Sequence, residues 1–156
     1  MSTPSVDAVP QVTKQIIQLE GATVRLAGDS GDGMQITGSQ LTNTSALAGN
    51  DIATFPDFPA EIRAPKGTRA GVSGFQVHFA SEEIFTPGDE LDALIAMNPA
   101  ALVTNIGDLK RGGILIANED NFTDKDLKLA HCSTNPLVDG TTDGYRLIKV
   151  PMSQLT

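Results

Sequence analysis

Apolar runs alternate with polar, glycine-rich segments along most of the chain, and both kinds of segment are short. This pattern predicts strands at residues 22–28, 51–58, 72–84, 92–97, 114–117 and 145–150. It predicts helices at residues 33–48, 99–110 and 121–130. Strands separated by helices favour an α/β fold, here a single domain with a mostly parallel, Rossmann-like layered sheet.

Two of the predicted strands also indicate their place in the sheet. Prolines interrupt residues 51–58, and because proline cannot donate a ladder hydrogen bond, this segment is predicted to be a short edge strand. In residues 72–84, Phe75, Val77 and Phe79 alternate with polar side chains, which predicts a strand with one covered face.

The first helix has few apolar positions with which to contact a sheet. Met34, Leu41, Leu47 and Ala48 are expected to supply its apolar side. Gly38 has no side chain, so it is expected to let the helix pack closely.

Turn and capping residues give the expected boundaries of the later helices. Gly112 and Gly113 are expected to end the second helix, and Thr123 to cap the third. Ser153 is expected to cap a further helix just before the sequence reaches Thr156, so we expect this chain to be part of a longer one.

The turn at residues 28–33 is the most distinctive local motif, because it follows the first strand directly and leads into the first helix. Glycines permit close approach to the backbone, and free N–H groups at a helix start favour an anion. The spacing G-x-x-G-x-G, however, matches neither the dinucleotide fingerprint nor a P-loop. Asp29 and Asp32 are expected to accept hydrogen bonds from the turn backbone. The alternative for this turn is a strand-to-helix connection that binds no ligand.

Asparagines follow two other predicted strands at the same edge of the sheet. The carboxyl ends of parallel strands meet at one edge, where ligands bind in folds of this class. Asn98 and Asn118 could each offer a ligand a donor and an acceptor. The alternative is that each one caps the next helix or turn.

Composition narrows the classes of function. The 156 residues are enough for one domain with its own core, and no apolar run is long enough to cross a membrane. The formal net charge of -8 argues against a nucleic-acid surface. The single cysteine excludes an intramolecular disulfide and is typical of the cytoplasm. Residues 1–20 lack the features of a signal peptide and are expected to form an extension before a domain at 21–156.

Four separated blocks of sequence occur together in a distinctive order. They are residues 28–35 (GDSGDGMQ), 50–63 (NDIATFPDFPAEIR), 71–79 (GVSGFQVHF) and 96–102 (AMNPAAL). This combination resembles the gamma-type domain at the N-terminus of the alpha subunit of 2-oxoacid:ferredoxin oxidoreductases. The second block is most similar to the enzymes that use 2-oxoglutarate.

The resemblance implies a multi-domain enzyme that oxidatively decarboxylates 2-oxoglutarate to succinyl-CoA and reduces ferredoxin. It implies thiamine diphosphate, Mg and an iron–sulfur cluster in the rest of the complex, since one cysteine cannot ligate a cluster alone. The implied partners are the remainder of the alpha subunit, a beta subunit and ferredoxin. Neither a nucleic acid nor a membrane is an expected partner.

Within this domain, the resemblance implies contact with coenzyme A by the loop residues Ser30, Gly31, Asp32, Gly33 and Met34. It extends to Asn98 and Asn118, and to Arg63 and Lys66, whose charges would meet the coenzyme's phosphates. The alternative for the last two is a solvated basic loop or one paired with a neighbouring subunit. No catalytic or metal-binding residue is expected in this chain. A stand-alone nucleotide- or phosphate-binding module and a purely structural interface domain stay open as other functions.

Overall fold

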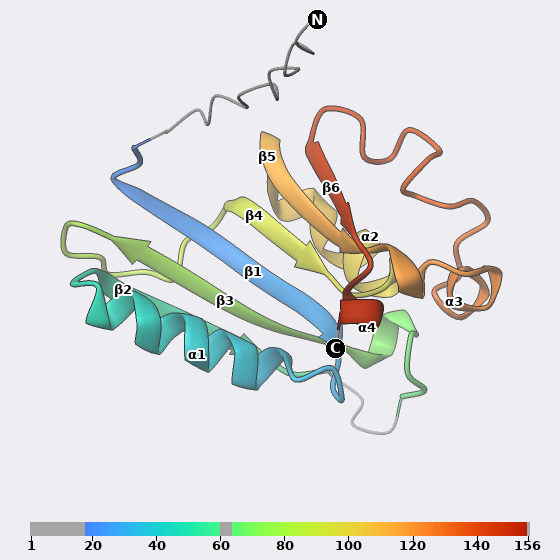
Figure 1. Ribbon diagram of the computed structural model, residues 1–156, viewed down its shortest axis with the longest axis horizontal. Coiled ribbons are helices and arrows are strands. Elements are labelled where there is room, and N and C mark those ends of the chain that lie inside the picture. The colour runs from blue at the N-terminus through green and yellow to red at the C-terminus, as the bar shows by residue number, and fades with distance from the viewer. Residues whose placement is uncertain (1–17, 60–63, 156) are drawn as a thin grey trace, which may run out of the picture.

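A computed structural model of the chain describes residues 18–59 and 64–155, and a six-stranded sheet forms its centre. The strands are β1 (Gly21–Asp29), β2 (Asp51–Asp57), β3 (Val72–Ala80), β4 (Leu91–Ala96), β5 (Leu109–Asn118) and β6 (Arg146–Val150). Their order is β2-β3-β1-β4-β5-β6, and among them β3 alone runs antiparallel to its neighbours (Figure 1). The predicted mostly parallel α/β sheet is therefore confirmed. Most of the expected extension at 1–20 lies outside the described residues.

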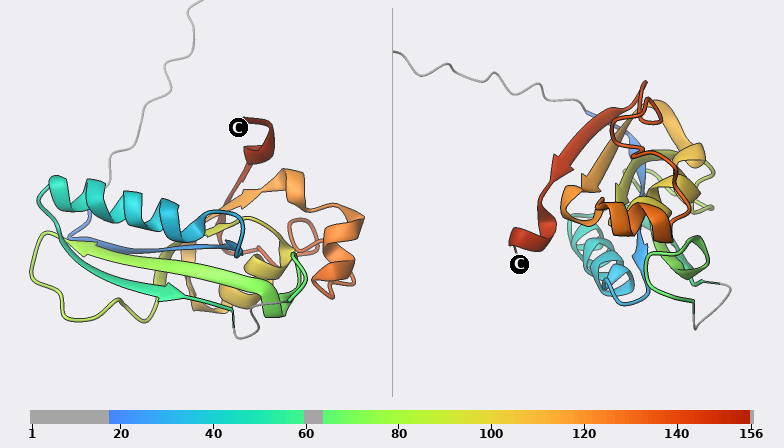
Figure 2. Two further views of the ribbon diagram at one scale, coloured as in Figure 1. Left: turned by 90° about the horizontal axis from the view of Figure 1, so that it is seen from below. Right: turned by 90° about the vertical axis from the view of Figure 1, so that its right-hand side faces the viewer.

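Helices cover both faces of this sheet. They are α1 (Met34–Leu47), α2 (Pro99–Asn105), α3 (Asp124–Leu129) and α4 (Met152–Leu155), with short 3-10 turns η1 (Arg69–Gly71), η2 (Ile106–Asp108) and η3 (Glu119–Asn121). Seen edge-on, α1 and α4 lie on one side of the sheet and α2 on the other (Figure 2). This arrangement is the layered fold that the alternating pattern predicted.

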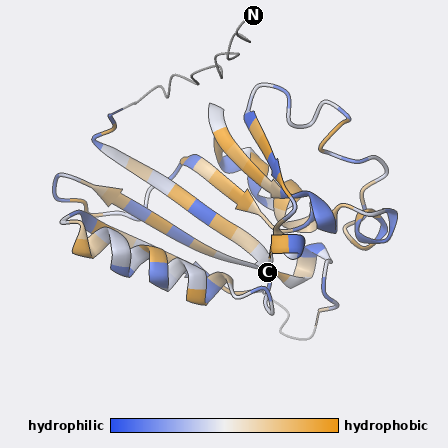
Figure 3. Ribbon diagram, viewed as in Figure 1, coloured by the Kyte–Doolittle hydropathy of each residue, from blue (hydrophilic) through white to orange (hydrophobic). Residues whose placement is uncertain are grey.

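The main apolar core lies between the sheet and α2. Leu94 of β4 and Leu115 of β5 are fully buried there, as are Ala101 and Leu102 of α2. Figure 3 shows the apolar parts of β4 and β5, which lie toward the carboxyl end of each strand. Such near-continuous apolar runs are typical of parallel strands buried inside a sheet.

Helix α1 packs on β3 and only partly as predicted. Met34 is buried, and Gly38 lies directly over the ring of Phe75, which confirms the close packing expected at this glycine. Leu47 is 90% exposed and Ala48 is also exposed, so their predicted place against the sheet is wrong. Leu47 falls on the opposite side of the helix from Met34 and Gly38, because at 3.6 residues per turn it lies about 220° around the axis from Met34 and about 180° from Gly38.

The second half of the predicted helix at 99–110 is wrong. Helix α2 ends at Asn105, and β5 already begins at Leu109 after one 3-10 turn. Gly112 takes a φ of 77°, and the register between β4 and β5 shifts in this part of the strand. The N–H of Gly112 donates to the Gly144 carbonyl at 2.7 Å. The glycine pair therefore marks a bulge inside a strand rather than the end of a helix.

Two other predicted boundaries and one predicted strand position can be compared with the structure. Thr123 caps α3 through a capping box with Asp126, as predicted. Strand β3 stops at Ala80 rather than at residue 84, because its two antiparallel neighbours begin opposite Ala80, at Gly21 and Asp51, and offer no pairing partner beyond it. The edge position predicted for residues 51–58 is confirmed, since β2 pairs with β3 and ends the described sheet.

Candidate functional site

The glycine turn between β1 and α1 is held by its own aspartates. The Asp32 N–H donates to the Asp29 carbonyl at 3.0 Å, and Asp32 Oδ2 accepts from the Asp29 N–H at 2.8 Å. Gly33 is the N-cap of α1 and takes a φ of 74°, a left-handed conformation that other residues adopt at a cost. The hydrogen bond expected from the turn backbone to an aspartate side chain is therefore present at Asp32, whereas the same expectation for the Asp29 carboxylate is wrong, because it accepts from residues outside the turn.

Asp29 joins this turn to two other segments. Asp29 is 9% exposed as a residue, and its Oδ1 accepts from the Gly67 N–H at 2.8 Å and from Asn98 Nδ2 at 3.1 Å. Burial raises the pKa of Asp29, and the charge of Asp32 acts in the same direction. The hydrogen bonds from Gly67 and Asn98 and the charge of Lys66 act in the opposite direction on that pKa. Sequence reasoning gave Asp29 a local role and missed this central position.

Asn98 and Asn118 lie where predicted, at the carboxyl ends of β4 and β5, with both carboxamides bonded internally. Asn98 is the N-cap of α2, and its Oδ1 accepts from the Ala101 N–H at 2.9 Å. Asn118 is fully buried, its Oδ1 accepts from the Met152 N–H at 3.0 Å, and its Nδ2 donates to Ser153 Oγ at 3.1 Å. Helix α4 therefore begins at Met152 and is capped from a distant strand, so the predicted cap at Ser153 is wrong. Direct ligand contact by either asparagine stays a prediction.

Lys66 lies close to the glycine turn although it is distant in sequence. A Cβ placed on Gly31 would lie 3.0 Å from Lys66 Nζ, so the ammonium group sits directly beside the turn. Lys66 is exposed, whereas the neighbouring Gly67 is buried against Asp29. Arg63 lies outside the described residues, so the structure does not test its predicted role.

Two cavities of different character flank the glycine turn. An apolar cleft of about 520 Å³ lies between residues of α1 and α4. Its walls are formed by Leu26, Asp32, Met34, Thr37, Ile95, Met97, Met152, Ser153 and Leu155. A polar cavity of about 270 Å³ opens toward α3. Its walls are formed by Asp29, Lys66, Gly67, Asn98, Asn121, Lys125, Asp126 and Leu129.

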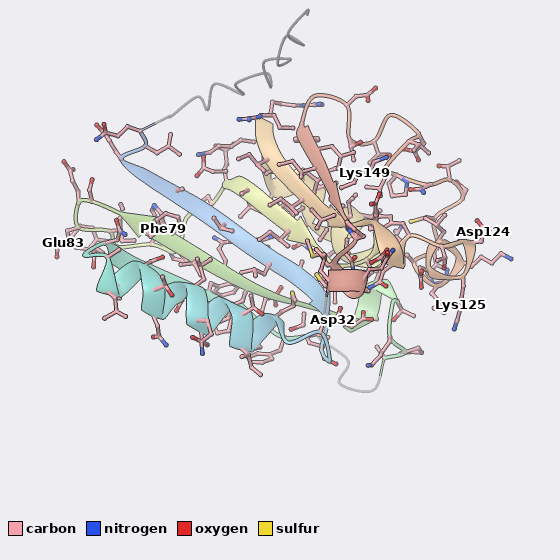
Figure 4. All side chains as sticks on the ribbon, in the orientation of Figure 1. Asp32, Phe79, Glu83, Asp124, Lys125 and Lys149 are labelled. Atoms are coloured by element: carbon pink, nitrogen blue, oxygen red, sulfur yellow. The ribbon has the colours of Figure 1, made fainter. Side chains whose placement is uncertain are left out.

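Some of the residues predicted to bind coenzyme A line one of these cavities, and others line neither. Asp32 and Met34 line the apolar cleft, and Lys66 and Asn98 line the polar cavity. Ser30 and Gly31 are exposed on the turn between them, and Asn118 is buried behind α4. Lys125 and Asn121 were missed, because their sequence neighbourhood shows only an ordinary capped helix. Figure 4 shows Asp32 beside α4 and Lys125 projecting from α3.

The described part of the chain offers no group of three or more histidine, cysteine, aspartate or glutamate side chains that could hold a metal ion. No helix in that part is long and apolar enough to span a membrane.

Residues 23–156 match the family described as pyruvate ferredoxin/flavodoxin oxidoreductase. The chain belongs to this family. It is 53% identical over 139 residues to the 2-oxoglutarate oxidoreductase subunit KorA of Mycobacterium tuberculosis, covering 89% of this chain and 21% of KorA. It is 31% identical over 106 residues to the 2-oxoglutarate synthase subunit KorC of Methanothermobacter thermautotrophicus, covering 67% of this chain and 53% of KorC. The chain thus spans about a fifth of the length of KorA and about half of KorC.

Solved structures of this oxidoreductase family share the fold. The 2-oxoglutarate:ferredoxin oxidoreductase from Magnetococcus marinus, solved with 2-oxoglutarate, coenzyme A and succinyl-CoA bound, aligns with a TM-score of 0.67 and 27% identity. That alignment covers 88% of this chain and 21% of the neighbour. The keto/oxoacid ferredoxin oxidoreductase gamma subunit from Geobacter sulfurreducens aligns with a TM-score of 0.58 at 19% identity, over 84% of this chain and 62% of the subunit. The resemblance to a gamma-type domain that the sequence motifs indicated is confirmed.

Proposed function

We propose that this chain is the coenzyme A-binding part of a complex that oxidises 2-oxoglutarate to succinyl-CoA and reduces ferredoxin. The 53% identity to KorA, a 2-oxoglutarate oxidoreductase subunit, supports the choice of 2-oxoacid. The similarity to a neighbour with coenzyme A and succinyl-CoA bound supports the choice of acyl acceptor.

The observation that carries the proposal is that the glycine turn lies between two cavities, one with an apolar lining and one with a polar lining that includes lysines. Coenzyme A has a phosphate-bearing nucleotide at one end and an uncharged pantetheine arm at the other. The apolar cleft suits the arm, and the polar cavity with its lysines suits the charged end. Ser30, Gly31 and Gly33 lie on the turn between the two cavities, where a bound chain would cross the backbone.

Within this proposal the other predicted residues have distinct parts. Asp32 and Met34 contact the ligand from the cleft, and Lys66 contacts its phosphates. Asn98 and Asn118 hold the strand ends in place through their internal hydrogen bonds, which leaves their carboxamides as supports for the site. Arg63 is proposed to add a second charge on the loop that carries Lys66.

The thiamine, magnesium and iron–sulfur groups are assigned to the rest of the complex. One cysteine cannot ligate an iron–sulfur cluster by itself, which supports placing the cluster outside this chain. The bound coenzyme A supplies the thiol that accepts the succinyl group. The remaining alpha subunit, the beta subunit and ferredoxin are the proposed partners, and the cytoplasm is the proposed location.

The proposal is tested on the purified native complex that contains this chain. Viologen reduction with 2-oxoglutarate is expected to depend on coenzyme A. Gly33→Val should raise the KM for coenzyme A several-fold, because a branched residue cannot hold the left-handed φ of 74° that shapes the turn. Gly107→Val is the matched control, since Gly107 has open space around it and lies in η2, away from the turn.

Three results would contradict this function. They are reduction without any effect of coenzyme A, no reduction with 2-oxoglutarate, and an equal effect of both glycine variants on the KM. Preferential binding of an adenine dinucleotide would instead favour a general nucleotide-binding module.

A further inference from the structure

We propose that the polar cavity beside Asp29 is a subsite for a phosphorylated ribose, in which Lys66 and Lys125 bind the phosphate and Asp29 accepts a hydrogen bond from a sugar hydroxyl. In coenzyme A this group is the 3′-phosphoribose, so the inference rests on the proposed function and adds the part of the ligand that these residues recognise.

The two lysines reach one cavity from separate parts of the chain. Lys66 comes from the loop before η1. Lys125 comes from the first turn of α3, where Figure 4 labels it. The ion pairs found among residues 18–59 and 64–155 join Arg25 to Asp108 and Lys110 to Asp92, and neither includes these lysines. Among these residues, neither lysine forms an ion pair with a carboxylate, so both ammonium groups are available to bind a phosphate. Lysine binds phosphate as a compact positive charge.

Asp29 explains why the ligand should bring a hydroxyl group as well as a phosphate. An ionised carboxylate only accepts hydrogen bonds and repels a phosphate in direct contact. Oδ1 already accepts from Gly67 and Asn98, and within the described residues no hydrogen bond reaches Oδ2. A ribose that places a hydroxyl beside its phosphate satisfies this second oxygen while the lysines take the charge.

The apolar cleft on the other side of the turn cannot take this role. Its described lining includes neither lysine nor arginine, and its charged residue is Asp32. Met34, Met97 and Met152 are among its apolar lining residues, which suits an alkyl chain. The two lysines therefore assign the phosphoryl group to the cavity between the turn and α3. Its other charged lining residues, Asp29 and Asp126, already accept hydrogen bonds inside the protein.

The test compares coenzyme A with 3′-dephospho-coenzyme A in the native complex. Lys125→Ala is expected to raise the KM for coenzyme A about ten-fold, because a hydrogen bond to a charged group is lost. The same variant should change the KM for 3′-dephospho-coenzyme A less than about two-fold, because this ligand lacks the phosphate that Lys125 binds.

Asp29→Asn should raise both KM values alike, because both ligands carry the ribose. Lys125→Arg should keep the discrimination in favour of coenzyme A.

Lys128→Ala is the matched control, since Lys128 lies on the same helix but outside the lining of the cavity. It should leave both KM values unchanged. Size-exclusion chromatography of each variant confirms that the complex is intact. If wild-type enzyme uses both acceptors with equal KM, or if Lys125→Ala raises both KM values equally, the subsite is wrong while coenzyme A binding stands. If coenzyme A has no effect on turnover at all, the proposed function itself fails.

Discussion

Asp29 connects three segments that are far apart in the sequence. Its backbone belongs to the end of β1, while its side chain bonds the Gly67 N–H of one loop and Asn98 at the start of α2. A buried carboxylate is costly unless hydrogen bonds compensate it. These contacts reduce that cost and fix the relative positions of the two loops and the strand end.

The raised pKa of Asp29 predicts a pH dependence of stability. Because this pKa lies above its ordinary value of 3.8, the native state holds the proton more tightly than the unfolded chain. The contribution of Asp29 to the free energy of unfolding is therefore fully present below pH 3.8 and is lost as pH rises through the folded-state pKa. Asp29→Asn keeps an acceptor for Gly67 and removes the titration. Its unfolding free energy relative to the wild type should rise through this window in urea titrations.

Asp139 provides a control, because its contribution to stability should change with pH in the opposite direction to that of Asp29. Hydrogen bonds from Thr134 and Thr141 lower the pKa of Asp139, so its contribution to stability is present above pH 3.8 and is lost as pH falls. Asp139→Asn should therefore lose stability relative to the wild type as pH rises. Two variants with the same pH trend would contradict the assignment.

At the scale of elements, Gly38 determines how closely α1 approaches β3. A Cβ placed there would lie 2.2 Å from the ring of Phe75, which is itself buried. No side chain fits without moving the helix or the ring. The polar side of α1 stays in solvent, and the first turn anchors to β3 through Gln35 Nε2, which donates to the Gly74 carbonyl at 2.8 Å.

Gly38→Ala should therefore destabilise the chain although alanine favours helices. Overpacking costs about 1–3 kcal/mol, whereas the gain in helix propensity is about 1 kcal/mol. Thermal unfolding should show a lower Tm, and Phe75→Leu in the same chain should recover part of the loss. Asn43→Ala, at an exposed position of α1, is the control and should have little effect. A higher Tm for Gly38→Ala would show that the helix can shift at no cost.

At the scale of the whole molecule, stability should be graded from the centre of the sheet to its edges. Strand β1 pairs on both sides, with β3 and β4, while β2 and β6 end the described sheet. The fully buried side chains cluster around β4 and β5. Backbone amides in the centre can exchange only when much of the sheet opens.

Hydrogen exchange measured by mass spectrometry should reveal this gradient. Peptides from β1 and β4 are expected to exchange slowest, and those from β2 and β6 faster. The amides of α4 should be among the fastest, because this helix has a single turn and exposed side chains. Equal protection of β1 and β2 would contradict the gradient.

The sequence by itself determined the fold class and most elements. The apolar runs predicted β1, β4 and β6 nearly to their ends, and the prolines correctly placed β2 at an edge. Thr123 was identified as a cap because a capping box is a local pattern of neighbouring residues. These features depend on interactions between residues that are close together in the sequence, so they can be predicted from the sequence alone. The motif blocks also identified the family.

Only the tertiary structure decided the features that depend on distant residues. The glycine pair at 112 and 113 forms a bulge because β5 pairs with β4 and meets Gly144, and neither contact is visible locally. Asn118 caps α4 across a gap of more than thirty residues. Lys66 and Lys125 line one cavity because the sheet brings a loop and a helix to the same edge. A linear sequence states which side chains exist, and folding decides which of them share a site.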